Sequence, residues 1–149
     1  MRERFASELK AAMKAADKRR VGTIRMIMAA LKDREIEARS QGKTLSDEDI
    51  LALLQKMTKS RKESQEIYEK AGRLDLSAQE AEEISIINSF LPQQLSESEV
   101  EAAIAATIAE TGASSVKEMG KVVGALKAQY AGRMDFAKAA ARVKAILGG

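Results

Sequence analysis

The sequence predicts an all-α protein, with an N-terminal multi-helix subdomain that contains a long helical hairpin and a compact C-terminal three-helix subdomain. Residues of high helix propensity dominate almost the whole chain, and runs of β-branched residues are short. Apolar residues recur at the spacing of a helix face, so no strand is expected. The only proline among the 149 residues, Pro92, interrupts this helical pattern once.

Two helices are predicted in the first 42 residues, because apolar side chains recur there at helical spacing and Asp17 between them suits the N-cap position. The second of these helices should end near Gly42. Ser46 is then expected to cap a long third helix, which Gly72 ends. The expected core positions of this third helix are Ile50, Leu53, Leu54, Met57, Ile67 and Tyr68.

A fourth helix and a break follow. Ser77 with Glu80 three residues later has the pattern of a capping box, so the fourth helix is predicted to start there. Pro92 should end the helical run, and we place the N-terminal subdomain at residues 1–91 and the C-terminal subdomain at 96–149. The three short helices expected in the latter run from Glu97 to Thr111, from Ser115 to about Tyr130 and from Asp135 to Leu147, with turns at Gly112 and Gly132.

The composition excludes most familiar catalytic schemes. The chain has no cysteine and no histidine, which removes thiolate nucleophiles, disulfides, the commonest zinc ligands and the side chain that titrates near neutrality. It has no apolar run of about 18 residues, and Glu3 and Glu8 near its start are unlike a signal peptide. We therefore expect a cytoplasmic protein without a membrane span, a metal, a cofactor or a catalytic centre of its own.

Two kinds of cluster invite a chemical interpretation that we do not favour. Ser114, Ser115 and Lys117 resemble a Ser–Lys pair, but serines before an amphipathic helix are expected caps, and an exposed lysine stays charged at neutral pH. The acidic clusters that begin at Asp47 and Glu80 both fall in a predicted first helical turn. Carboxylates are favourable there because of the helix dipole, so a metal site is not expected.

Basic charge gathers at the two ends of the chain. Residues 1–43 hold twelve Lys or Arg against six Asp or Glu, and residues 114–149 hold seven against two. The stretch 44–113 between them is acidic, with six against fourteen. This distribution suits contact with a polyanion, although solvated helices also segregate charge, and the sequence alone leaves both explanations open.

Two glycines lie inside the predicted middle helix of the C-terminal subdomain. Gly120 and Gly124 each cost about 1 kcal/mol relative to alanine in a helix interior, so a compensating contact is expected. Packing against the alanine-rich neighbouring helices is the interpretation that we favour for Gly124. The alternative is the close approach of a partner such as a sugar-phosphate chain, with charge supplied by Lys121, Lys127 and Arg133.

Seven short stretches, spread over the whole chain, carry a family signature: Leu9–Ala15, Ile24–Met26, Ala71–Leu76, Phe90–Ser96, Ile108–Ser115, Met119–Val122 and Gly132–Arg133. They resemble the YqeY family, small helical proteins related to the tail domain of the GatB subunit of tRNA-dependent amidotransferases. The resemblance implies an all-α fold with two subdomains. It also implies a carbon–nitrogen ligase label, with glutamine as amido-N-donor, although in GatB the tail is understood to contact tRNA while another domain performs the amidation.

The leading hypothesis is an accessory module that binds tRNA or another structured RNA through its C-terminal subdomain. Its contacts should be with phosphate, ribose and overall shape, because the chain has only five aromatic residues, of which Tyr130 is the best candidate for stacking. The expected RNA-binding residues are Lys121, Lys127, Arg133, Lys138, Arg142, Gly120, Gly124 and Gly132.

Two alternatives stay open. One is a protein-interaction or scaffold module without an RNA ligand, in which the basic first hairpin and the long helix after Ser46 dock to a protein partner. The other is a carbon–nitrogen ligase, as the family label says. That activity would need a nucleophile, a base and a nucleotide site, and the sequence shows none of these.

Overall fold

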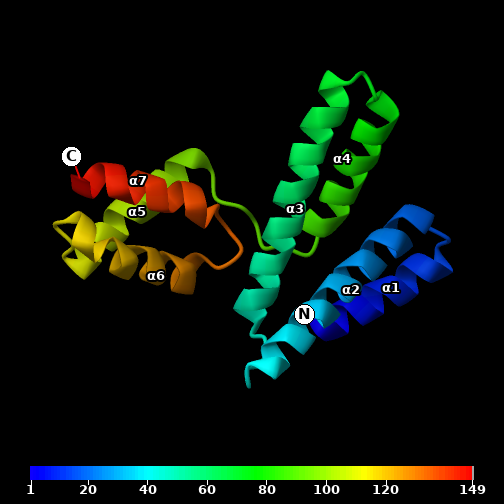
Figure 1. Cartoon of the computed structure of the whole chain (residues 1–149), viewed down its shortest axis with the longest axis horizontal. Helices are drawn as coiled ribbons and strands as arrows, with labels where there is room; N and C mark the ends of the chain where they lie inside the picture. The colour runs from blue at the N-terminus through cyan, green and yellow to red at the C-terminus, as the bar shows by residue number, and fades with distance from the viewer. Residues whose placement is uncertain (149) are drawn as a thin grey trace. The chain divides into compact units, whose positions relative to one another are not determined.

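The computed structural model describes residues 1–148 and contains, in that range, seven α-helices, one short 3₁₀ helix and no strand (Figure 1). The all-α prediction is therefore confirmed. The chain divides into two compact units, the first from Met1 to Leu91 and the second from Pro92 onward. The first unit holds α1 (Arg2–Lys14), α2 (Lys18–Ser40), α3 (Asp47–Lys70) and α4 (Leu74–Asn88). The second unit holds α5 (Glu97–Thr111), η1 (Val116–Glu118), α6 (Met119–Tyr130) and α7 (Phe136–Gly148).

Side-chain caps set where three of the helices begin, as the sequence predicts. The Asp17 carboxylate accepts a hydrogen bond from the backbone N–H three residues on, at the start of α2 (3.1 Å). Ser46 and Asp49 form a complete capping box at α3, and Ser96 and Glu99 form another at α5. The hydrogen bond from the N-cap backbone lowers the pKa of Asp49 and of Glu99, which keeps both charged at the positive helix end.

The start of α4 and the outer end of α3 differ from the prediction. α4 begins at Leu74, directly after the left-handed turn at Gly72 (φ +73°), so Ser77 lies inside the helix and opens no capping box. Ser77 is buried there, and its hydroxyl donates to the Glu69 carboxylate (3.2 Å). Ile67, expected in the core, is 66% exposed, because α4 is the only helix of the first unit beside this end of α3 (Figure 1).

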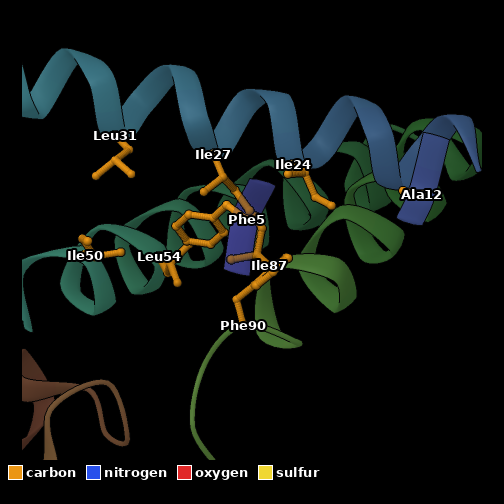
Figure 2. Close-up of a cluster of buried hydrophobic side chains, with 9 residues drawn as sticks. All are labelled: Phe5, Ala12, Ile24, Ile27, Leu31, Ile50, Leu54, Ile87 and Phe90. Carbon is orange, nitrogen blue, oxygen red and sulfur yellow. The ribbon is translucent and has the colours of Figure 1, made fainter. Parts of the chain in front are cut away.

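The core of the first unit joins its first helix to the end of its last. Phe5 on α1 and Phe90 just after α4 are almost fully buried, and their rings meet edge to face with centroids 5.0 Å apart (Figure 2). The guanidinium groups of Arg4 and Arg20 lie 5.0 and 5.6 Å from the centre of the Phe90 ring, whose π face attracts cations. The buried apolar cluster consists of Phe5, Ala12, Ile24, Ile27, Leu31, Ile50, Leu54, Ile87 and Phe90.

The second unit has its own core of small and branched side chains. α5 ends at Gly112 (φ +68°), as predicted. The middle helix differs from its prediction, because the first turn is the 3₁₀ helix η1 and α6 itself starts at Met119 rather than Ser115. Asp135 caps α7 by accepting a hydrogen bond from the N–H of Ala137 (2.9 Å). The buried cluster consists of Ala103, Ile104, Ala113, Val122, Leu126, Met134, Ala139 and Val143.

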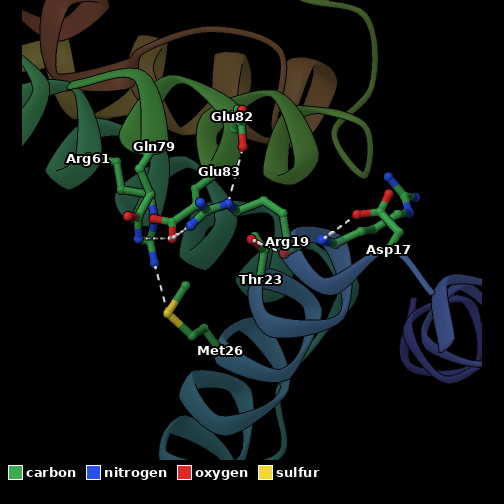
Figure 3. A network of polar contacts seen from close by, with 9 residues as sticks. Asp17, Arg19, Thr23, Met26, Arg61, Gln79, Glu82 and Glu83 are labelled. Carbon is green, nitrogen blue, oxygen red and sulfur yellow. Dashed lines mark hydrogen bonds and ion pairs between the residues drawn. The ribbon is translucent and has the colours of Figure 1, made fainter. Parts of the chain in front are cut away.

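A polar network joins α2, α3 and α4 around a buried carboxylate (Figure 3). Glu83 on α4 is only 8% exposed. The Nε of Arg61 on α3 donates to it at 3.2 Å, and an Nη of Arg19 on α2 lies 3.9 Å away. Arg19 also pairs with the exposed Glu82 (3.1 Å). Because an unpaired buried charge is strongly destabilising, the two arginines are what allows Glu83 to lie here.

Replacing Arg61 with methionine should lower the free energy of unfolding by about 2–4 kcal/mol, because Glu83 would stay buried with only the more distant Arg19 as a cation and Gln79 as a neutral donor beside it. Urea unfolding followed by circular dichroism measures this loss. The matched control is Arg73→Met, since the pair of Arg73 and Asp75 is more than half exposed and contributes little to stability. Equally small losses in the two variants would contradict the part given to Arg61.

Glu80, one turn before Glu83, is the carboxylate that the network leaves unsatisfied. Its Oε2 is buried and has no hydrogen-bond partner among the described residues. Burial, followed by the neighbouring charge of Glu83, raises the pKa of Glu80, and Arg61 offsets this only in part. The folded state therefore holds this proton more tightly than the unfolded state, so the ionised side chain weakens the fold above its unfolded pKa.

Replacing Glu80 with glutamine should raise the free energy of unfolding at pH 7, by up to about 1 kcal/mol. The gain should disappear as the pH falls below the unfolded pKa of about 4.3, where Glu80 itself is protonated in both states. Thermal unfolding of both proteins from pH 4 to pH 8 measures the difference. The control Glu82→Gln, at an exposed position paired with Arg19, should show no gain, and a pH-independent effect at Glu80 would contradict the titration.

Candidate nucleic-acid interface

One side of α6 is open to solvent. Val122 and Leu126 are fully buried, whereas Gly120, Gly124 and Lys127 are exposed. The exposed three are spaced by four and three positions, so they form one stripe along the helix. A β-carbon added to either glycine would meet nothing within 4 Å beyond its own chain neighbours and its own helix backbone. The favoured interpretation of Gly124, a contact with the alanine-rich helices, is therefore wrong.

Two lysines lie beside these glycines. The Nζ of Lys121 donates to the backbone carbonyl of Thr111 in the last turn of α5 (3.1 Å), where the helix end is negative. This bond uses one of the three ammonium hydrogens, and the side chain stays exposed. Lys127 is exposed and forms no hydrogen bond or ion pair with the described residues. Both charges can therefore face a ligand.

Gly132 and Arg133 have a structural part that the sequence did not indicate. Gly132 is buried with φ +74°, a conformation that favours glycine. Its carbonyl accepts a hydrogen bond from the Gln94 side chain (2.6 Å), and the Arg133 Nε donates to the carbonyl of Gln93 (3.0 Å). The Arg133 carbonyl in turn accepts from the N–H of Leu95 (2.9 Å). These bonds tie the turn after α6 to the segment before α5.

The two predicted contacts on α7 differ from each other. Lys138 and Arg142 are both exposed and lie one turn apart. The Nε of Arg142 pairs with the Glu101 carboxylate of α5 at 2.8 Å, which offsets its charge. Lys138 has no such partner within residues 1–148. Lys138 therefore offers a free charge to a ligand and Arg142 does not.

The structure gathers four of the eight predicted residues on the open side of α6, namely Gly120, Lys121, Gly124 and Lys127. Lys117 and Lys144 are two further exposed cations that the sequence analysis did not include among the RNA contacts, and their place in the basic segment 114–149 was the available signal. Tyr130, the stacking candidate, is half buried and packs against the second core. Its ring therefore has a packing role.

The described part of the chain contains neither a cluster of metal ligands nor a membrane-spanning helix. Within residues 1–148, no three His, Cys, Asp or Glu side chains converge as metal ligands would. None of the helices in the same range combines the length and the apolar character that crossing a membrane requires.

The family of the protein follows from its match over nearly the whole chain. A model of the YqeY family, described as Yqey-like protein, matches residues 2–147. The chain belongs to this family. The match includes both units, so the resemblance seen in the seven short stretches is confirmed, and the open side of α6 is a feature of a YqeY-like protein.

Two curated relatives share parts of this YqeY-like chain. Altered inheritance of mitochondria protein 41, a mitochondrial protein of Lachancea thermotolerans, is 38% identical over 105 residues, which are 69% of this chain and 55% of the relative. An uncharacterized protein of Schizosaccharomyces pombe is 32% identical over 84 residues, which are 56% of this chain and 66% of the relative. The chain thus spans between half and two thirds of the length of these relatives.

Alanine at Gly124 should stabilise this YqeY-like protein by about 0.5–1 kcal/mol, because it raises helix propensity and meets no neighbour. A rise in Tm measures the gain. The matched control is Gly112→Ala, where φ +68° is unfavourable for any L side chain, so the same change should cost on the order of 1 kcal/mol. An equal loss at Gly124 would mean that another element packs closely on this side of α6.

Proposed function

We propose that this YqeY-like protein is an accessory RNA-binding module, with tRNA as its ligand and no catalytic centre of its own. The observation that supports this best is the open side of α6, where two exposed lysines lie beside two exposed glycines. Each glycine costs stability in a helix, and no neighbouring element within residues 1–148 comes within 4 Å of a β-carbon added there. A ligand that approaches the helix backbone would use that space.

The chemistry of this surface suits a sugar-phosphate chain. Lys121 and Lys127 supply charge to phosphates, and Gly124 between them has no side chain that would keep a ribose away from the helix backbone. Lys138 on α7 adds a third cation, and this one has no internal partner among the described residues. Base stacking plays little part in the proposal, because Tyr130 packs against the core. Recognition would rest on charge and on the shape of a structured RNA.

We also propose that the protein has no catalytic activity of its own and acts in the cytoplasm. The carbon–nitrogen ligase label would require turnover with glutamine, ATP and charged tRNA by the pure protein, and we expect none. We place the RNA-binding activity in the cytoplasm, which subcellular fractionation of the native host would test. The rival role, docking of the first unit to a protein, does not use the open side of α6.

Binding of the full chain to total tRNA, followed by fluorescence anisotropy across a salt series, tests the proposal. The variant to compare carries Lys121→Gln, Lys127→Gln and Lys138→Gln. Its affinity should fall about tenfold or more, and the slope of log K against log salt should decrease by about 0.7–0.9 for each phosphate that the variant no longer neutralises. Arg133 and Arg142 are left unchanged, because their side chains bond to Gln93 and Glu101.

The matched control neutralises three exposed lysines on α3 with Lys56→Gln, Lys59→Gln and Lys62→Gln, which changes the net charge equally. This control should keep both the affinity and the salt slope. Equal losses in the two triple variants would show nonspecific attraction, and unchanged binding in both would contradict the assigned surface. A DNA duplex of equal charge should bind more weakly than tRNA.

A further inference from the structure

Four cations recur on α2 at intervals of seven residues. Lys18, Arg25, Lys32 and Arg39 are all exposed, and no side chain among them forms an ion pair or hydrogen bond with the described residues. Seven residues are close to two turns of an α-helix, so the four lie along one side. At 1.5 Å per residue, the row is about 31 Å long.

Small and apolar residues alternate with these cations. Gly22, Ala29 and Ile36 each follow one cation by four positions and precede the next by three, and all are exposed. Ile36 is 56% exposed, and nothing lies within 4 Å of a β-carbon added at Gly22. Alternating steps of four and three are the pattern by which two helices pack side by side. We call the seven residues from Lys18 to Arg39 at this spacing the α2 seam.

The first unit does not use this seam for its own fold. The buried residues of α2, such as Ile27 and Leu31, lie on the opposite side of the helix. Ile36 is exposed, and the four cations beside it have no partner among the described residues, so the seam has no role in the core. The pattern is therefore a surface that remains open within the unit.

An apolar groove borders the seam. It has a volume of about 470 Å³ and lies between the start of α1 and the middle of α2, where Met28 and Ala29 supply apolar surface. Lys32 belongs to both the groove and the seam. Arg2 and Glu35, also at the groove, pair with each other, so Lys32 supplies its uncompensated charge. The groove thus extends the apolar part of the seam, and its one acidic side chain, Glu35, is already paired with Arg2.

We infer that the α2 seam docks an α-helix of another protein, one that carries carboxylates at seven-residue intervals with apolar residues between them. Such a helix would place carboxylates beside the four cations and apolar side chains against Ala29, Ile36 and the groove. Gly22 and Ala29 are small enough to let the two backbones approach closely. Charge complementarity along the whole row therefore selects an acidic partner helix.

Two other occupants fit the seam less well. A second copy of this chain, packed seam to seam, would bring four cations against four cations, which is a repulsive arrangement. An RNA would use the cations, but exposed Ile36 and the apolar groove contribute nothing to phosphate contact. The apolar residues between the cations are what favours a protein helix.

The test measures binding of the full chain to a fluorescein-labelled helical peptide of four heptads. In each heptad, two positions of the peptide face the α2 seam, and they carry leucine and glutamate. We expect binding in the micromolar range, and about tenfold weaker binding of a peptide with glutamine in place of glutamate. The variant Arg25→Glu with Lys32→Glu should lose the glutamate peptide by a similar factor. It should instead bind a peptide that carries lysine at those positions, and Ile36→Ser should weaken the original complex severalfold.

The matched control reverses two exposed lysines on α3, Lys59→Glu and Lys62→Glu, and should bind the glutamate peptide as the unchanged protein does. Equal loss in this control, or no preference for glutamate over glutamine, would overturn the inference. Loss of tRNA binding in the Arg25 and Lys32 variant, without any peptide binding by the unchanged protein, would assign the seam to a polyanion. The tRNA comparison with the α6 lysine variant keeps this outcome distinct from failure of the proposed function.

Discussion

The edge-to-face contact of Phe5 with Phe90 is the constraint on which the first unit depends. Phe5 lies on the first helix and Phe90 follows the last, so this one contact closes the unit from end to end. Arg4 strengthens the closure twice, because it lies over the Phe90 ring and donates to the carbonyl of Ser89 (2.6 Å). α2 contributes Ile24, Ile27 and Leu31 to the same buried cluster, and the opposite side of this helix is left outside.

Six of the seven cations of α2, all but Arg34, fall into two sets. Arg19 and Arg20 lie near the core and are paired, Arg19 with the carboxylates of α4 and Arg20 with Glu8 of α1 (2.8 Å). The outward set has no partner among the described residues. The excess of basic residues in positions 1–43 is therefore partly structural and partly surface charge.

The sequence predicted what depends on near neighbours and failed where distant residues decide. The caps at Asp17, Ser46 and Ser96 were predictable, because each bonds to backbone within three residues. The same rule placed Ser77 at a helix start and was wrong, since the turn at Gly72 had already opened α4. The open α6 residues were identified from charge and glycine alone. The partners of Arg133 and Arg142 lie about forty residues away in the chain, so no local pattern revealed them.

Both proposed surfaces share one local feature, an exposed glycine that lies between cations on one face of a helix. On α2 Gly22 lies between Lys18 and Arg25, and on α6 Gly124 is followed three residues later by Lys127. The two surfaces differ in the apolar surface near this glycine. The α2 seam adds exposed Ile36 and an apolar groove, whereas the exposed side of α6 adds no large apolar side chain. Burial of apolar area stabilises a complex with a partner that brings its own apolar residues. The α2 seam therefore suits a helix, and the exposed side of α6 suits a hydrated phosphate backbone.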